Sequence, residues 1–155
     1  MKKTSHQKFE SDESGSLRIE LTESPVDHNE LMNSVQDHSC GASVLFLGTV
    51  REFTNGKQTN SLTYEAYHEM AINEIHKLIE QARQQWNVKH VGIIHRLGPL
   101  ALGESAVAIA VSSPHRADSF AAAQFLMDEI KKSVPIWKQE HWSDGSTEWV
   151  HPEQK

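Results

Sequence analysis

Pro135 constrains the fold of this chain more than any other residue. It lies in residues 127–140 (MDEIKKSVPIWKQE), where it ends a helix, because proline lacks a backbone N–H and restricts the residue before it. An apolar strand is predicted to follow directly, so the chain must change from helix to strand within a few residues. Lys131 lies just before this break and Lys138 just after it.

The two lysines have a chemical interpretation and a structural one. Lys131 follows Met127 by four positions, which places it at the margin of the predicted inner face of the helix. An amine against apolar surface and near a second cation has a lowered pKa, and such a lysine can act as a base or a nucleophile. Alternatively, lysines at a helix C-terminus simply complement the helix dipole.

Size and composition exclude several classes of protein. A chain of 155 residues is expected to form one domain that buries a substantial core. The formal net charge of -6 argues against nucleic acid as the main partner. One cysteine provides no internal disulfide framework, and no apolar run approaches the length of a membrane span. With no signal peptide visible, the cytoplasm is the expected location.

The order of predicted elements indicates an α+β or mixed α/β fold. Residues 1–15 are polar and aperiodic, and we expect them to form a disordered leader before a single domain at 16–155. The predicted strands are 16–21, 42–51, 62–67, 88–96, 104–112, 136–142 and 147–150. The predicted helices are 27–38, 69–86 and about 115–134. The short hairpins among these strands argue against an entirely parallel sheet.

The inner faces of the two long helices are predicted from their apolar residues. For the helix at 69–86 the inner face comprises Met70, Ile75, Leu78, Ile79, Ala82 and Trp86. For the helix at 115–134 it comprises Phe120, Ala121, Phe125, Met127 and Ile130.

Two further segments offer cations to an anionic ligand. Arg51 leaves a buried strand, where its guanidinium can bind a carboxylate or phosphate, although a solvent-facing strand end is an equal possibility. His115 and Arg116 begin a helix after Ser113-Pro114, so backbone amides and side-chain cations face the same direction, although pairing with a nearby acidic side chain is an equal possibility. If these residues converge with Lys131 and Lys138, they form a cationic pocket. Glu140 points to the same strand face as Lys138 and could hold it in place or relay a proton.

Other chemistries have weaker support. The ten histidines show no paired ligand spacing on a predicted helix, so no metal site is expected. No glycine-rich phosphate-binding pattern is present, so no nucleotide cofactor is expected either.

Three ordered blocks carry a resemblance to a known family. They are Gly48-Thr-Val-Arg51 with residues 62–67 (LTYEAY), residues 94–98 (IHRLG) with Gly103-Glu104, and residues 113–116 (SPHR) leading into 127–140. In this order the chain resembles the large, catalytic subunit of molybdopterin synthase over about residues 17–150. The resemblance implies a mixed α/β fold of the hammerhead type.

The same resemblance implies a function and partners. The family is a sulfurtransferase of molybdenum cofactor biosynthesis that makes the dithiolene of molybdopterin from cyclic pyranopterin monophosphate. Sulfur arrives as a C-terminal Gly-Gly thiocarboxylate on a small ubiquitin-like carrier subunit. Two large subunits form the central homodimer of a heterotetramer, with no nucleic acid, membrane or cofactor involved.

By position, the resemblance also implies the site residues. Lys131 and Lys138 would be the essential amines of the catalytic domain. The substrate-binding residues would be Thr49, Val50, Arg51, His115, Arg116, Lys131, Lys138, Gln139 and Glu140. The alternative is a non-catalytic module that binds an anionic peptide tail or a phosphometabolite, for which only charge would matter and Lys131→Arg would be tolerated.

Overall fold

The computed structural model describes residues 5–150, which form two β-sheets and three helices. In chain order the elements are β1 Ser5–Asp12, β2 Gly15–Thr22, α1 His28–Ser34, β3 Ala42–Thr49, β4 Phe53–Thr54, β5 Lys57–Ala66, α2 His68–Gln85, β6 His90–Arg96, β7 Gly98–Ala101, β8 Ser105–Ser113, α3 Arg116–Ser133, β9 Ile136–Trp142 and β10 Thr147–Val150. The predicted mixed α+β class is confirmed.

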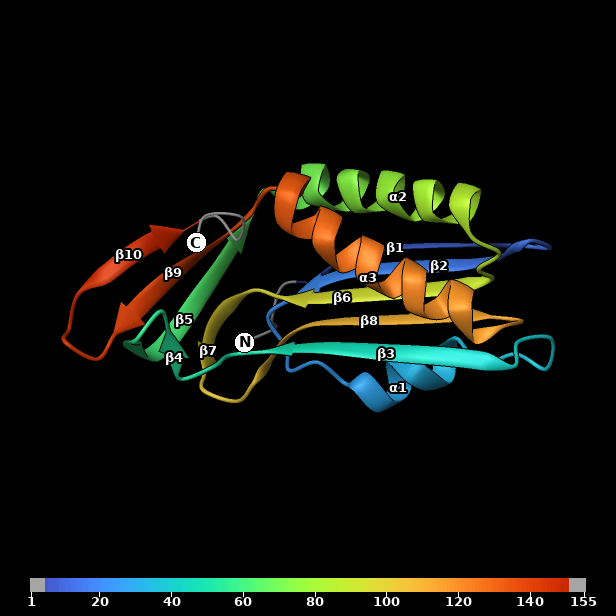
Figure 1. The fold of residues 1–155 in the computed structure, drawn as a ribbon. Coiled ribbons are helices and arrows are strands. Elements are labelled where there is room, and N and C mark those ends of the chain that lie inside the picture. Colours follow the sequence, from blue (N-terminus) through green and yellow to red (C-terminus); the bar gives the residue numbers. More distant parts are fainter. Residues whose placement is uncertain (1–4, 151–155) are drawn as a thin grey trace.

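The first sheet has the strand order β1-β2-β6-β8-β3 and is mixed, because β2 and β6 are parallel while the other neighbours are antiparallel. Helices α2 and α3 cover one face and the short α1 covers the other (Figure 1). The central strands β6 and β8 are therefore almost wholly buried, which explains their continuous apolar sequence. The main core lies between this sheet and the two long helices.

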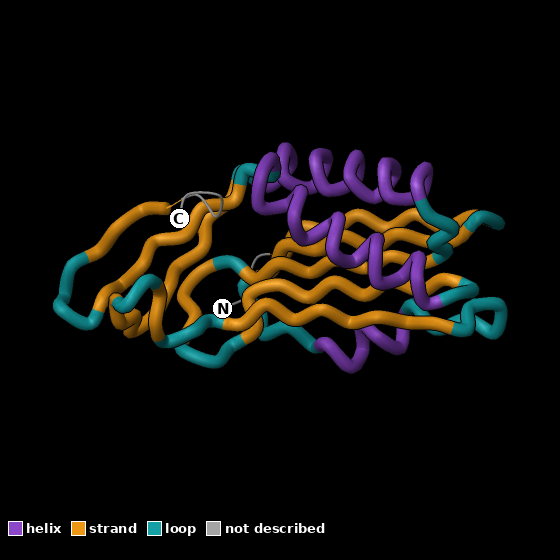
Figure 2. Tube along the Cα trace, in the orientation of Figure 1, coloured by secondary structure: helices purple, strands orange, loops and turns teal. Residues whose placement is uncertain are grey.

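The second sheet has the order β10-β9-β5-β4, and β7 also pairs with β5. Its strands extend beyond the ends of β3 and α3, away from the helical layer (Figure 2). A smaller apolar cluster of Val50, Leu62, Leu100 and Ala106 lies at its base. No helix within residues 5–150 is long and apolar enough to cross a membrane.

The prediction of a disordered leader at residues 1–15 is wrong for residues 5–15, which form strand β1 and its tight connection to β2, while residues 1–4 lie outside the described part of the chain. This strand pairs antiparallel with β2 from Ser5–Thr22 to Asp12–Gly15. Gly15 makes the tight connection possible, because its φ is +139° and a Cβ at this position would lie only 1.7 Å from the Lys89 carbonyl oxygen, which excludes other residues. The strand was missed because its outer face is polar and its side chains are mostly exposed.

Helix α3 is rotated relative to the prediction. Its buried residues are Ser119, Ala122, Ala123, Leu126 and Ile130. Phe120, predicted to face the core, is instead 62% exposed. The small side chains let the helix backbone lie close to β3 and β8, a position that bulky aromatic rings would prevent. The outward face of α3 therefore carries Phe120, partly buried Met127 and Lys131. In α2, Met70 is likewise 56% exposed rather than inward.

Candidate functional site

The junction between α3 and β9 forms as the proline predicts. The chain leaves the helix at Val134, whose backbone is extended and whose N–H donates to the Ile130 carbonyl. The Pro135 carbonyl then accepts from the Tyr67 N–H at 3.1 Å, which fastens the junction to the start of α2. The Tyr67 and Trp137 rings meet edge to face with centroids 5.0 Å apart. The junction is thus a fixed corner between the helical layer and the second sheet.

Lys138 is held by a buried carboxylate, as its spacing from Glu140 in the sequence predicts. Its Nζ lies 3.1 Å from Oε1 of Glu140, which has only 2% of its surface exposed. The other carboxylate oxygen accepts a hydrogen bond from the Thr59 hydroxyl at 2.9 Å. Because Glu140 is fixed from two sides, the ammonium group of Lys138 has little freedom to move, although its side chain remains 22% exposed.

Tyr64, which is partly buried, lies beside this ion pair, and the buried His95 contacts Tyr64. Tyr64 is the cross-strand partner of Lys138. Burial, aided by the negative charge of Glu140, raises the pKa of Tyr64 to about 12, so its phenol stays protonated. The Tyr64 ring meets His95 edge to face at 4.8 Å. Burial lowers the pKa of His95 to about 4, despite the hydrogen bond between its Nδ1 and the Arg96 carbonyl.

The buried His95 gives the protein a pH dependence with a definite sign. The pKa of His95 is about 4 in the folded chain and 6.5 in the unfolded chain. Between these two pH values the unfolded chain binds a proton that the folded chain does not, so acidification favours unfolding. The contribution of His95 to the free energy of unfolding should be complete above about pH 6.5. It should fall by about 2–3 kcal/mol between about pH 7 and about pH 4.5. Urea unfolding at both pH values measures this loss.

A His95→Gln variant is the control for this prediction, because glutamine does not titrate. We expect its stability to change less over the same pH range than that of the wild-type protein, whatever its absolute stability. Equal changes in the two proteins would contradict the assignment.

Lys131 lies in the last turn of α3, on the outer face that the rotation of the helix creates. Its side chain is exposed, and within residues 5–150 its amine forms no ion pair. Its neighbour Lys132 differs, because it pairs with Glu129 at 3.8 Å. The apolar wall expected around the Lys131 amine is therefore not supplied by the described part of this chain.

The segment after β3 approaches the same end of the molecule. Thr49 and Arg51 are exposed, whereas Val50 is 4% exposed and packs in the smaller apolar cluster. Val50 therefore belongs to the packing that supports the site and not to its exposed surface. The backbone carbonyl of Glu52 accepts from the Thr59 N–H at 2.7 Å, and Thr59 in turn binds Glu140. Through Thr59, the residue after Arg51 is therefore connected to the ion pair between Lys138 and Glu140.

The structure does not bring His115 and Arg116 to this corner. Both are exposed at the first turn of α3, at the opposite end of the helix from Lys131 (Figure 1). Fifteen positions separate Arg116 from Lys131 (131 − 116 = 15), which corresponds to about 22 Å along an α-helix. The expected single pocket is therefore not formed within one chain.

Gln139 lies on the other face of β9 from Lys138 and Glu140. It is partly buried and pairs with Thr63, whose hydroxyl is 3.0 Å from Nε2 of His141. Thr59 and Tyr64 were missed as parts of the site. Thr59 lay outside the predicted return strand at 62–67, and only the pairing of β5 with β9 places both beside Glu140 and Lys138.

These features define an α+β protein with a helix–strand corner that presents fixed and exposed cations, a site suited to anionic substrates. The model of the MoaE protein family matches residues 21–133. The chain belongs to this family.

Relatives and a solved structure agree with this assignment. The chain is 42% identical to the molybdopterin synthase catalytic subunit of Bacillus subtilis, covering 86% of this chain and 84% of the relative. It is 45% identical to molybdopterin synthase catalytic subunit 1 of Aedes aegypti, covering 84% and 86%. The crystal structure of molybdopterin synthase from Staphylococcus aureus matches with a TM-score of 0.79 at 37% identity, over 84% of this chain and 94% of that chain.

Proposed function

We propose that this protein is the catalytic subunit of a molybdopterin synthase. It transfers sulfur from the C-terminal thiocarboxylate of a small ubiquitin-like carrier subunit to cyclic pyranopterin monophosphate, and forms the dithiolene of molybdopterin. The observation that carries the proposal is the placement of Lys131 and Lys138 around one corner, in a chain whose relatives are named as catalytic subunits. The word subunit in those names also supports a further chain as partner.

The charges at this corner suit both reactants. A thiocarboxylate and a phosphorylated pterin are anions, and an acidic protein can bring them together only where its cations are concentrated. Lys138 is largely neutralised by Glu140 and is held in one position. Lys131 and Arg51 remain exposed and available to the substrates. We assign the chemical step to Lys131, as base or as nucleophile toward the carrier's acyl group, and the electrostatic support to Lys138.

His115 and Arg116 can serve the same substrate if a second copy of the chain supplies them. The outward face of α3 carries Phe120, and edge strand β3 beside it carries Phe46, which is 38% exposed. Antiparallel packing of two such faces would cover this apolar surface. It would also place the first turn of α3 in one copy near Lys131 of the other. We propose that the site is completed in this way within a homodimer at the centre of a heterotetramer.

Reconstitution tests the proposed reaction. The purified chain is mixed with a thiocarboxylated carrier and cyclic pyranopterin monophosphate, and the dithiolene product is measured. We expect turnover that depends on the thiocarboxylate, with none from the same carrier ending in an ordinary carboxylate. A chain that binds the competent carrier but forms no dithiolene would instead be a non-catalytic binding module.

We also propose the cytoplasm as its location. A single cysteine, Cys40, which is not in a disulfide, fits a reducing compartment.

A further inference from the structure

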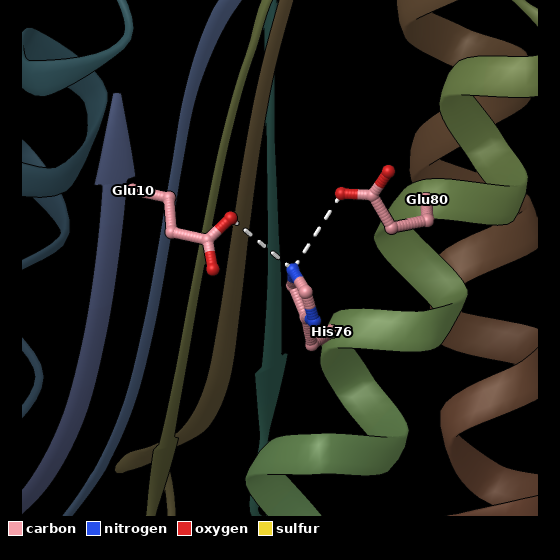
Figure 3. A group of neighbouring side chains, drawn as sticks. All are labelled: Glu10, His76 and Glu80. Atoms are coloured by element: carbon pink, nitrogen blue, oxygen red, sulfur yellow. Dashed lines mark ion pairs between the residues drawn. The ribbon is translucent and has the colours of Figure 1, made fainter. Parts of the chain in front are cut away.

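A cluster of three potential metal ligands joins strand β1 to helix α2, on residues to which the proposed sulfur transfer assigns no role. His76 and Glu80 lie four positions apart on α2 and so share one face of the helix, while Glu10 reaches them from β1 (Figure 3). Nε2 of His76 is 3.4 Å from Oε1 of Glu10 and 3.5 Å from Oε1 of Glu80. One ligand atom from each residue lies within 4.8 Å of the other two.

The nitrogen at the centre of the cluster is buried without a hydrogen bond. Nε2 of His76 is shielded from solvent, and no hydrogen-bond partner for it is found within residues 5–150. Both carboxylates approach it at ion-pair distance, as Figure 3 shows, but neither is a hydrogen-bond partner. Buried polar atoms are nearly always satisfied, so an orphaned imidazole nitrogen facing two carboxylates indicates a missing partner.

We propose that Glu10, His76 and Glu80 bind a Zn²⁺ ion. Zinc–nitrogen and zinc–oxygen bonds are each about 2.1 Å long, so two ligands of a tetrahedral ion lie roughly 3.4 Å apart. The two separations measured from Nε2 match this spacing. Glu10 and Glu80 have half-exposed side chains, which gives them the freedom to complete the geometry. An imidazole ligand favours zinc over magnesium or calcium, which prefer oxygen ligands alone.

The fourth position of the ion is open to water. A polar hollow of about 380 Å³ adjoins the cluster and is lined by Glu10 and Glu80. Within this hollow Arg83 approaches Glu80 at 4.0 Å, the limit of an ion pair, so it leaves the carboxylate largely free. Three protein ligands and a water form the usual open zinc site.

Lys8 is the group that competes with the metal. Its Nζ is 3.4 Å from Nδ1 of His76 and 3.8 Å from Oε2 of Glu10. Zinc bound at Nε2 leaves the imidazole proton on Nδ1, so Lys8 must move away from that nitrogen. The competing arrangement is a protonated His76 that pairs with both glutamates. In that arrangement no zinc binds, whereas in the zinc site the removal of Lys8 frees Nδ1 to carry the imidazole proton and frees Glu10 for the ion, so zinc binding becomes tighter.

Titration of the full-length, chelator-treated protein with ZnCl₂ in a calorimeter tests the proposal. We expect His76→Gln and Glu80→Gln each to weaken zinc binding by at least about 10-fold. Lys8→Gln should tighten it. The matched control is His38→Gln, which removes a histidine from a loop away from the cluster and should leave the affinity unchanged.

Thermal unfolding provides a second readout that does not depend on sulfur transfer. Zinc should raise the unfolding temperature of the wild-type protein, because it fastens β1 to α2, and should not raise that of His76→Gln. Unchanged affinity in His76→Gln, or an equal loss in His38→Gln, would overturn the site. Weaker binding in Lys8→Gln would overturn the proposed geometry. The zinc measurements do not depend on sulfur transfer. If the wild-type protein forms no dithiolene, the zinc site can still be confirmed or rejected.

Discussion

Replacing Lys131 by alanine should lower the rate of dithiolene formation by about 10²–10⁴-fold, the usual contribution of a positioned acid, base or nucleophile. Stability should change by no more than about 0.5 kcal/mol, because the side chain is exposed and its amine pairs with no described residue. The rate is measured in the reconstituted reaction with thiocarboxylated carrier, and the stability by urea unfolding. Carrier binding should remain, since α3 and its corner stay folded.

Two companion variants separate chemistry from charge. Lys132→Ala removes the adjacent lysine from the same helical turn, where it pairs with Glu129, and should leave the rate near normal. Lys131→Arg keeps the positive charge but provides no group that can deprotonate, so it should be nearly as inactive as the alanine variant. An arginine variant with full activity would favour the non-catalytic binding role of this residue. Near-normal turnover by Lys131→Ala would remove it from the mechanism altogether.

The parts of the fold that the sequence predicted are those governed by local chemistry. Pro135 ends α3 within two residues of the predicted position. The apolar runs of β6 and β8 indicate strands covered on both faces, because they are short, continuous and bounded by turn residues. The contact between Lys138 and Glu140 follows from the two-residue period of a strand and needs no tertiary information.

The missed features depend on contacts between distant segments. Strand β1 has few buried side chains, and its pairing with β2 is its main stabilisation. The rotation of α3 is not apparent from the sequence, because small residues such as Ala122 and Ala123 face the sheet in the first half of the helix while the larger Phe120 faces outward. Thr59 became visible only through the pairing of β5 with β9. The cluster of His76 and Glu80 contains no second histidine, and its third member, Glu10, lies in a segment predicted to be disordered.

The length of α3 can be predicted from the sequence, and it argues against a single pocket that contains cations from both ends of the helix. A helix from about 115 to 134 necessarily separates its first turn from Lys131 by more than about 20 Å, at roughly 1.5 Å per residue. The cations that begin and end this helix are therefore far apart within one chain, and the proposed homodimer is the arrangement that would bring them together. The sequence predicts residue types suited to an anion site, but which of them belong to one site depends on the arrangement of chains, which no local pattern specifies.

Mixing two inactive variants should restore activity if the site is shared between copies. Lys131→Ala lacks the lysine of the site, and the double variant His115→Ala, Arg116→Ala lacks the cations from the first turn of α3. Each should be inactive alone, because every site in its homodimer lacks one contribution. In a mixed dimer, one site has Lys131 together with His115 and Arg116. The other site lacks all three of these side chains. Random assortment makes half of the dimers mixed, so about a quarter of the wild-type activity should return.

The control for this experiment pairs Lys131→Ala with Lys138→Ala. Both lysines belong to the same chain's share of the site, so every site in the mixed dimer still lacks one of them and no activity should return. The formation of mixed dimers is verified by carrying different affinity tags on the two variants. Mixed dimers that are present but inactive in the first pairing would show that His115 and Arg116 act elsewhere. Restoration in the first pairing alone places them at the partner's lysines, as the proposed homodimer requires.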